Sequence, residues 1–508
     1  MSDEDVAALL NSDVPLVVIE APAGCGKTYQ GSCYASLAAS GLDTGRVLIL
    51  THTHAACGVF AKETQGKRDQ VEIRTIDSLI VQIAAAYHRS LDLPADPYLW
   101  ARQAGGSFPE LASRVAALLD HKPMISKALA DRYPIVIGDE HQDSSPHQDA
   151  VMMSLNRAGS RLRIFGDPMQ RIYGGSNRAA ADADRQRWED MKTAGAYMEL
   201  EYPHRWRDGS PALGQWILHA RQTLRDGNPI DLTDGLPEGL QVILVENCAR
   251  THAGYQLSRD ERQPVDHIVN SSENLLVLTG RNETVDALAA FWSRRIPIWE
   301  GHTREALEGL VDASIAQDGN AIAIADALVV FLGKVAVGFS PSSHGDRLMK
   351  EVTSGCIRAA RGKPALIQEI GRFILAEPNY VGISRCLVRL SELIDQRIPG
   401  FESIKIDYRR EYKDAIRLVD FSDPASGLVE INRRRSFARP MPPRKSISTI
   451  HKAKGLECEH AVIVPCDAQT FSSTEYARCK LYVALSRAKR TLTLVLSTNN
   501  QSPLFNLR

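Results

Sequence analysis

Residues 17–28, Val-Val-Ile-Glu-Ala-Pro-Ala-Gly-Cys-Gly-Lys-Thr, decide the fold of this chain. The apolar start predicts a buried strand, and the pattern from Tyr29 predicts a helix that ends near Gly41. Between them lies a loop of small residues, namely Ala23, Gly24, Cys25 and Gly26. Its N–H groups and the positive helix N-terminus would attract phosphate oxygens. Lys27 would then reach the β- and γ-phosphates of ATP, and the Thr28 hydroxyl would bind Mg²⁺.

The composition is typical of a soluble globular chain with several domains. The 508 residues are 44% hydrophobic and 24% charged, and the net charge of −1 requires any nucleic-acid site to be a local basic surface. The nine cysteines contain no Cys-x-x-Cys pair, which argues against zinc or iron–sulfur ligation and for reduced thiols. We see neither a membrane span nor a signal-peptide core, and therefore expect a cytoplasmic protein without membrane contact.

Strands and helices alternate along the first part of the chain, which favours a parallel sheet with helices on both faces. Between residues 79 and 131 the strand signals vanish, so we expect a helical insertion there. A second α/β unit begins after residue 207, and the spacing is again mostly helical from about 300 to 436. The last core strand is expected at 491–496, with no appended nuclease domain after it.

A basic stretch at 432–439 precedes several prolines. We expect it to be an extended linker. Its role would be either phosphate contact or that of a plain solvated connection.

Two further strand ends carry polar side chains. Asp139 and Glu140 follow an apolar run, and ligands bind at the carboxyl ends of parallel strands. Asp139 would hold Mg²⁺, and Glu140 would orient and deprotonate the attacking water. The alternative, a plain acidic loop, is disfavoured by the phosphate loop upstream. After the next run, Gln170 could sense the γ-phosphate, and Tyr173 could either stack on a base or simply fill the core.

Seven motifs in chain order resemble those of superfamily 1 helicases of the UvrD/Rep/PcrA type. They read Ala-Pro-Ala-Gly-Cys-Gly-Lys-Thr at 21–28, Leu-Thr-His-Thr-His-Ala-Ala at 50–56, Asp-Glu-His-Gln-Asp at 139–143, Gly-Asp-Pro-Met-Gln-Arg-Ile-Tyr-Gly at 166–174, Leu-Glu-Tyr-Pro-His-Arg at 200–205, Ser-Thr-Ile-His-Lys-Ala-Lys-Gly-Leu-Glu at 448–457 and Leu-Tyr-Val-Ala-Leu-Ser-Arg-Ala-Lys at 481–489. The ordered set is highly specific, although residues 207–447 match only loosely.

The resemblance implies two RecA-like parallel-sheet P-loop domains, each with a mainly helical insertion, and ATP between them. The first domain would comprise residues 1–78 and 132–197 around an insertion at 79–131, and the second residues 198–299 and 440–508 around an insertion at 300–439. The resemblance also implies that Arg205 and Arg487 reach the γ-phosphate from the second domain. Guanidinium groups there stabilise the charge on the transferred phosphoryl group. Glu457 would contact the nucleotide sugar or a catalytic water.

By the same resemblance, the chain would be an ATP-hydrolysing DNA helicase that moves 3′→5′, the direction associated with the Lys-Gly-Leu-Glu form at 454–457. Its expected partners are single-stranded DNA and, where unwinding occurs, duplex DNA. The candidate DNA contacts are Thr51, His52, His54, Thr75, Tyr173, Arg281, His451 and Lys454. Backbone contacts would make binding sequence-tolerant and salt-sensitive.

Several departures from the family pattern bear on base recognition. No Gln precedes the phosphate loop, where the family usually reads adenine. Tyr29 stands where Arg is frequent and His204 where Tyr is usual, so we expect Tyr29 and His204 to bracket the base. Gly175 replaces a base-stacking Trp, which would remove about 1–3 kcal/mol of base contact.

A second function stays open for this sequence. Short UvrD-like proteins accompany nucleases in bacterial antiphage systems of the Gabija type. The short chain, the reduced second insertion and the missing Gln and Trp would suit a DNA- or nucleotide-sensing ATPase subunit of such a complex, with little unwinding of its own. Its partner would be a nuclease or another defence or repair protein.

Overall fold

The computed structural model describes residues 2–52, 54–67, 69–102, 107–173, 178–246, 248, 250–251, 254–299, 305–438 and 442–507. The chain divides into two compact units. The first unit comprises Met1–Ser293 and Thr449–Arg508 and contains two parallel sheets. The second unit, Arg294–Ser448, is mainly helical.

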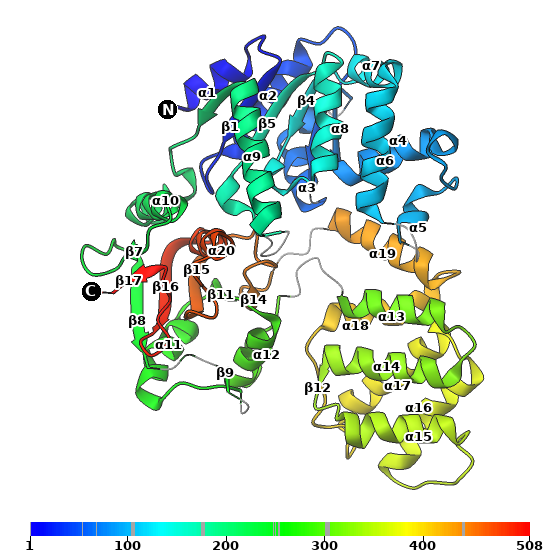
Figure 1. Cartoon of the computed structure of the whole chain (residues 1–508). Helices are drawn as coiled ribbons and strands as arrows, with labels where there is room; N and C mark the ends of the chain where they lie inside the picture. The colour runs from blue at the N-terminus through cyan, green and yellow to red at the C-terminus, as the bar shows by residue number, and fades with distance from the viewer. Residues whose placement is uncertain are drawn as a thin grey trace. The chain divides into compact units, whose positions relative to one another are not determined.

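The phosphate-loop strand lies inside a six-stranded sheet of order β3-β2-β4-β5-β1-β6 (Figure 1). Every neighbouring pair is parallel; Val18, for example, lies opposite Ile164 on one side and Tyr197 on the other. The strands are β1 (Leu16–Glu20), β2 (Val47–Thr51), β3 (Val71–Thr75), β4 (Ile135–Gly138), β5 (Arg161–Gly166) and β6 (Ala196–Glu199). Because all six run the same way, the loops after β1 and β4 lie at the same edge.

Alternate strand residues pack against different helices, as the pleat requires. Val18 and Leu50 share a core with α4, α6, α8 and α9, whereas Val17 and Ile49 share another with α1, α2 and α3. The predicted helical insertion therefore packs on this sheet. These helices are α1 (Asp3–Leu10), α2 (Lys27–Ser40), α3 (His54–Glu63), α4 (Ile76–Ala86), α5 (Pro97–Arg102), α6 (Phe108–His121), α7 (Pro123–Arg132), α8 (Pro146–Arg157) and α9 (Arg178–Ala194).

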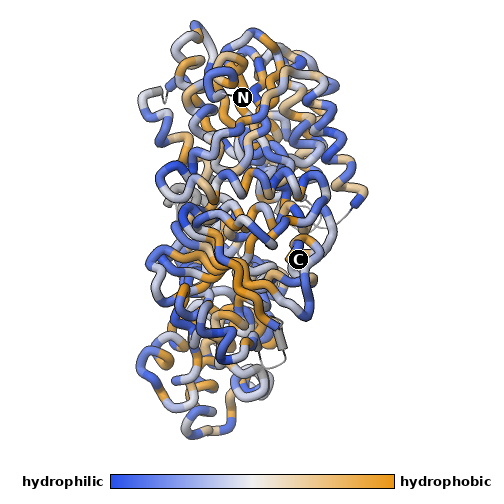
Figure 2. Tube along the Cα trace, turned by 90° about the vertical axis from the view of Figure 1, so that its left-hand side faces the viewer, coloured by the Kyte–Doolittle hydropathy of each residue, from blue (hydrophilic) through white to orange (hydrophobic). Residues whose placement is uncertain are grey.

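The second sheet of the first unit contains β11, β15, β16 and β8 in this order, again all parallel. The last six residues of its strand β16 are buried. Figure 2 shows apolar stretches of chain beside the C-terminus of the protein. The strands are β8 (Leu240–Val245), β11 (Leu275–Thr279), β15 (Cys458–Cys466) and β16 (Ala488–Ser497), and the helices beside them are α10 (Pro211–Arg225), α11 (Arg259–Ser271), α12 (Asn282–Phe291) and α20 (Glu475–Leu485). Strand β14 (Lys445–Thr449) contains the boundary between the two units.

Short elements complete the first unit. Two-residue strands pair β7 (Ile230–Asp231) with β17 (Phe505–Asn506), and β9 (Arg250–Thr251) with β10 (Gly254–Tyr255). Single 3₁₀ turns are η1 (Gln65–Lys67), η2 (His88–Leu91), η3 (His141–Asp143), η4 (Pro168–Gln170) and η5 (His204–Trp206). Two of them, η4 and η5, carry predicted site residues, and η3 directly follows Asp139 and Glu140.

The second unit packs its helices around one apolar core that includes Leu307, Phe331, Ile374 and Leu387. Its elements are α13 (Glu305–Ala316), α14 (Ala321–Val335), β12 (Ala336–Val337), η6 (Pro341–Gly345), α15 (Asp346–Thr353), α16 (Lys363–Ala376), α17 (Tyr380–Asp395), β13 (Lys405–Ile406), α18 (Arg409–Arg417), η7 (Leu418–Asp420) and α19 (Pro424–Ala438).

The expected extended linker is wrong for residues 432–438, because they continue helix α19. Arg favours a helix, and no proline interrupts this stretch before Pro440. Residues 439–441, which follow this stretch, lie outside the described residues.

The structure confirms the predicted fold class, an α/β chain with two parallel sheets of the RecA-like kind. The predicted domain boundaries stay predictions. Within the described ranges, no helix is both long and apolar enough to cross a bilayer.

A buried arginine joins the two sheets of the first unit. Arg221 of α10 donates to Asp167 Oδ1 at 2.9 Å and to Glu199 Oε1 at 2.6 Å, and it also pairs with Glu20. Its side chain is 3% exposed. Burial alone would lower the pKa of Arg221, but Asp167, Tyr482 and the two glutamates raise it well above its usual value. The helix of one sheet is thus fixed to the strand ends of the other.

Replacement of Arg221 by methionine should lower the free energy of unfolding by about 3–5 kcal/mol, because Asp167 would lose its cation and Glu20 would keep only Arg225. Urea unfolding at pH 7 measures the loss. Arg225→Ala is the control. Its side chain also contacts Glu20 but is 37% exposed, so the expected loss is below about 1 kcal/mol. Equal losses in the two variants would contradict the role given to Arg221.

Candidate functional site

The phosphate loop between β1 and α2 needs glycine at two positions. Gly24 and Gly26 have φ angles of 76° and 84°, in the left-handed region. A Cβ on Gly24 would lie 2.6 Å from the Trp206 ring, and one on Gly26 would lie 3.2 Å from His204. The loop therefore packs directly against η5, and the Arg205 N–H donates to the Gly24 carbonyl at 3.0 Å.

The loop lysine and the two carboxylates after β4 contact one another. Lys27 Nζ lies 3.3 Å from Asp139 Oδ1 and also pairs with Glu140. Burial alone would lower the pKa of Lys27, but Asp139 and Glu140 raise it. Burial alone would raise the pKa of Glu140, but Lys27 and Lys454 lower it. Glu140 is therefore ionised at neutral pH and able to accept a hydrogen bond.

The predicted metal ligands suit Mg²⁺. Thr28 lies in the first turn of α2, and Asp139 directly follows β4. Both offer hard oxygen atoms, the ligands that Mg²⁺ prefers. Within the described residues, the buried Asp139 Oδ1 accepts no hydrogen bond and has only its ion pair with Lys27. A buried carboxylate oxygen beside a phosphate loop, with an ammonium as its partner, is a hard ligand that fits a Mg²⁺–phosphate complex.

Two glutamines connect the carboxylates to the next strand. Gln142 donates to Glu140 Oε2 at 2.5 Å, and its own oxygen accepts from the Asp167 N–H at 3.0 Å. The buried Gln170 donates to Asp167 Oδ2 at 3.0 Å. The amide of Gln170 is therefore held by Asp167 in this structure, and its contact with a γ-phosphate stays a prediction.

Arg205 lies beside the loop, paired with the predicted sugar contact. Its guanidinium donates to Glu457 Oε1 from Nε at 3.1 Å and from Nη2 at 2.7 Å, and to the Ser486 carbonyl at 2.6 Å. Lys489 Nζ lies 2.8 Å from Glu457 Oε2. Burial alone would raise the pKa of Glu457, but Arg205 and Lys489 lower it to about 2. The structure thus brings Arg205 and Glu457 together.

Arg487 is buried, and its hydrogen-bond partners lie within residues 456–486. It donates to the carbonyls of Val483 at 2.8 Å and Leu456 at 3.1 Å, and to Ser486 Oγ at 2.6 Å. Burial and the nearby Arg205 lower its pKa to about 10. A γ-phosphate contact would require this guanidinium to leave its present partners, so that role stays a prediction.

Tyr29 and His204 both lie beside the loop. Tyr29 is 65% exposed, and the His204 ring lies next to Gly26. His204 Nε2 is 2.7 Å from Asp3 Oδ2, and its ring makes an edge contact with Tyr202. The structure leaves the face of Tyr29 accessible. Bracketing of a base by these two rings stays a prediction.

Three predicted DNA contacts form one cluster. Tyr173 OH lies 3.5 Å from the His451 carbonyl, and Lys454 Nζ lies 4.9 Å from the centre of the Tyr173 ring. Lys454 also donates to Asp143 Oδ2 at 2.5 Å and to the Gln170 carbonyl at 2.7 Å. Lys454 therefore connects the ring of Tyr173 to the turns η3 and η4.

His52 belongs to a hydrogen-bonded chain. Its Nε2 lies 2.9 Å from Ser144 Oγ, which is 3.2 Å from His141 Nδ1, and His141 Nε2 lies 2.8 Å from Asp149 Oδ1. Burial and the neighbouring His141 lower the pKa of His52 to about 3. A neutral imidazole cannot form an ion pair with a phosphate, so any contact of His52 with DNA would be a hydrogen bond or a stacking contact.

The remaining candidates lie at strand ends. Thr51 and Thr75 are opposite each other in the parallel register of β2 and β3, and Thr75 Oγ1 caps α4. Arg281 follows β11 and precedes α12, and burial together with Arg281 lowers the pKa of Lys480 to about 8. His54 begins α3, but its side chain, like Gly175, lies outside the described residues.

Sequence reasoning missed Tyr482. This buried side chain of α20 accepts a hydrogen bond from the Ala23 N–H of the phosphate loop at 2.8 Å. The neighbouring Cys25 is also buried, and burial raises its pKa to about 12. Tyr482 lies in the motif at 481–489, so the sequence could have indicated it. Nothing in the sequence around Arg221 indicated that Arg221 joins the two sheets.

Two family models match the chain. The UvrD/REP helicase N-terminal domain matches residues 101–180, and the UvrD-like helicase C-terminal domain matches residues 446–495. These segments contain Asp139 and Glu140 at one end of the site and Lys454 and Arg487 at the other. No curated protein matches the chain. In these two segments, which carry residues from both parts of the site, the chain is similar to UvrD/Rep-like superfamily 1 helicases.

Proposed function

We propose that this protein hydrolyses ATP to move 3′→5′ along single-stranded DNA and to open duplex DNA. One observation carries the proposal. Lys27, Glu140 and Arg205 converge on one loop from β1, β4 and the turn before α10. This set supplies a phosphate anchor, a base and a charge-stabilising cation, the parts that phosphoryl transfer needs. The direction rests on the sequence at 454–457.

In the proposed reaction, the loop N–H groups and Lys27 hold the β- and γ-phosphates. Thr28 and Asp139 would hold Mg²⁺, which neutralises charge on the phosphate oxygens when it is bound. Glu140 accepts the proton of the water that attacks the γ-phosphorus, and the bond to the leaving ADP oxygen breaks. Arg205 and Arg487 offset the charge that spreads over the transferred group.

The charged groups of the site are paired with one another before ATP arrives. Lys27 is held by Asp139 and Glu140, and Arg205 by Glu457. A triphosphate would exchange these pairs, so that binding itself rearranges the boundary between the two sheets of the first unit. ATP would therefore bind more tightly to the conformation with exchanged pairs than to the present one. Such a difference in affinity is what nucleotide-driven movement requires.

DNA would act on the same site through Lys454. Its ammonium contacts Asp143 and the Gln170 carbonyl, and it lies over the ring of Tyr173. A base stacked on Tyr173 would therefore be one side chain away from the turns that carry Glu140 and Gln170. We infer that this contact carries the stimulation of hydrolysis by DNA.

A sensing ATPase within a nuclease-containing complex is the second candidate. The hydrogen bonds of Arg487 to the carbonyls of Val483 and Leu456 favour it. Arg487 must leave these carbonyls before it can reach a γ-phosphate, and the binding of another molecule would be needed to release it. A partner nuclease would supply that event in place of DNA alone.

Single-stranded DNA should strongly raise the rate of ATP hydrolysis, and Lys27→Ala should lower the stimulated rate at least about 10²–10³-fold, because the phosphates lose their cation. A steady-state assay with and without an oligonucleotide measures both. The control is Lys127→Ala, which removes an exposed lysine. Displacement from a 3′-tailed but not a 5′-tailed duplex tests the direction. Hydrolysis that ignores DNA but responds to a nuclease partner would favour the second candidate.

Tyr29→Ala should raise the KM for ATP several-fold with little change in kcat, because a stacking ring contributes to binding of the base in both the ground state and the transition state. Tyr87→Ala, which removes an exposed ring at the end of α4, should leave KM unchanged. An unchanged KM in the Tyr29 variant would exclude the bracketing role.

Lys454→Met should reduce the DNA-stimulated rate about tenfold or more, because it breaks the connection to Asp143, a buried charged contact. Asp143→Asn should have a similar effect. If the two residues act as one link, the double variant should be no slower than either single variant, and the coupling energy follows from the double-mutant cycle. Additive losses would show that they act separately.

A further inference from the structure

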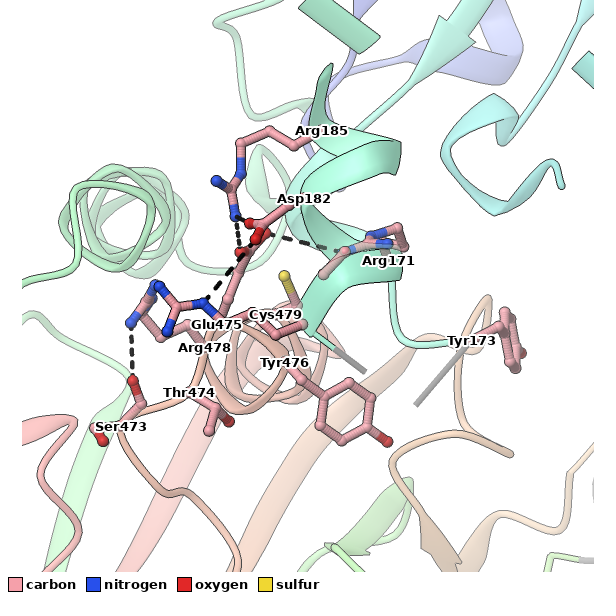
Figure 3. A pocket seen from close by; sticks show the side chains of 12 residues that line it. Arg171, Tyr173, Asp182, Arg185, Ser473, Thr474, Glu475, Tyr476, Arg478 and Cys479 are labelled. Atoms are coloured by element: carbon pink, nitrogen blue, oxygen red, sulfur yellow. Dashed lines mark hydrogen bonds and ion pairs between the residues drawn. The ribbon is translucent and has the colours of Figure 1, made fainter. Parts of the chain in front are cut away.

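A second concave site lies away from the phosphate loop. A cavity of about 500 Å³ lies between the first turns of α9 and α20 (Figure 3). This volume is in the range of ligand pockets, roughly 300–1,000 Å³. Its wall includes four arginines and two tyrosines: Arg171, Arg178, Arg185, Arg478, Tyr173 and Tyr476. None of the residues assigned to ATP lines it.

The wall of the cavity carries four arginines and two carboxylates, Asp182 and Glu475, and Arg171 also pairs with Asp184 outside the wall, so that positive charge remains in excess. Arg185 is engaged with both of these carboxylates. The side chain of Arg178 is 95% exposed and reaches Asp182 only at 4.0 Å. Arg478 donates to the Ser473 carbonyl at 3.0 Å and, within the described residues, pairs with no carboxylate. Arg178 and Arg478 can therefore bind an anion.

The aromatic part of the wall continues the predicted DNA contacts. Tyr476 OH lies 2.5 Å from His451 Nε2, and the two rings are stacked with centres 6.0 Å apart. The half-exposed Tyr173 contacts the His451 carbonyl. Figure 3 shows Tyr476 and Tyr173 on the same side of the cavity, one from α20 and the other from the segment that precedes α9. His451 thus contacts both rings, and both line the same cavity as Arg178 and Arg478.

We propose that this cavity receives one nucleobase of bound single-stranded DNA, which stacks on Tyr476 while the adjoining phosphates contact Arg178 and Arg478. Every base has an aromatic face, so a tyrosine can bind it without reading the sequence. Guanidinium groups bind phosphate oxygens in pairs, and the tyrosine ring beside them favours a nucleotide chain over an acidic peptide, because each nucleotide also offers a base that can stack on it. The inference rests on the proposed function and adds Tyr476 as a second stacking ring, where the sequence had suggested that one was missing.

Photo-crosslinking tests the placement of the base. The full chain is bound to oligonucleotides that carry 5-iododeoxyuridine, irradiated, digested and sequenced by mass spectrometry. We expect an adduct on Tyr476 in addition to any on Tyr173. Adducts on Tyr173 without any on Tyr476, across all positions of the modified base, would overturn the proposal.

Binding measurements test the contribution of each group. Loss of a stacked base costs about 1–3 kcal/mol, so Tyr476→Ala should weaken the affinity for the oligonucleotide about fivefold to a hundredfold. Tyr476→Phe, which keeps the ring, should bind nearly as well as the unchanged chain. Arg478→Gln should reduce the slope of log affinity against log salt by about 0.7, the value for one phosphate of a single strand.

The controls separate this inference from the proposed function. Tyr87→Ala, which removes an exposed ring elsewhere, should not weaken binding, and the thermal unfolding midpoint shows whether each variant is folded. If the unchanged chain binds single-stranded DNA and its ATPase is stimulated, but Tyr476→Ala binds equally well, only the cavity assignment fails. If the unchanged chain does not bind single-stranded DNA, both the assignment and the proposed function fail.

Discussion

The arrangement of the site depends on one buried cation. Arg221 is surrounded by Glu20, Asp167 and Glu199, each at or just beyond the end of a strand in the first sheet. A buried charge is tolerated only when partners replace the water that it has lost, so this guanidinium has few alternative positions. Since Arg221 lies on α10, the chain just before α10 is also fixed. That chain carries Arg205 and His204 to the phosphate loop.

Around this fixed contact, the other charges are exchangeable. Lys27, Arg205 and Lys454 each pair with a carboxylate that also has a proposed role in hydrolysis or its control. Such pairs compensate charge while the nucleotide is absent, and a phosphate oxygen can take the place of the carboxylate so that the cation keeps a negative partner. The ion pairs of Arg221 are fixed, whereas those of Lys27, Arg205 and Lys454 can exchange partners. This contrast suits the proposed movement, in which the two sheets of the first unit shift but stay joined.

Contiguous motifs were predicted well, and contacts between distant segments were not. The strand–loop–helix order around Lys27 and the carboxylates after β4 follow from local apolar pattern and turn chemistry, and the fold class followed from their alternation. The helix over 432–438 was misjudged because the prolines that suggested a linker begin only at residue 440. Arg221 and Tyr476 could not be assigned, because their partners Asp167 and His451 become neighbours only when the sheets and helices pack.

The buried thiol of the phosphate loop has a consequence for chemical reactivity. Thiolate is the form that attacks alkylating and oxidising reagents, and burial, which raises the pKa of Cys25 to about 12, keeps this thiol protonated at pH 7. The side chain is also closed to solvent, whereas Cys33, farther along α2, is exposed. Electrophiles would therefore label the outer surface of this helix well before they reached the nucleotide site. Peroxide would likewise leave Cys25 unoxidised until the surrounding packing opened. Oxidation of this cysteine, which lies in the phosphate loop, should therefore be slow.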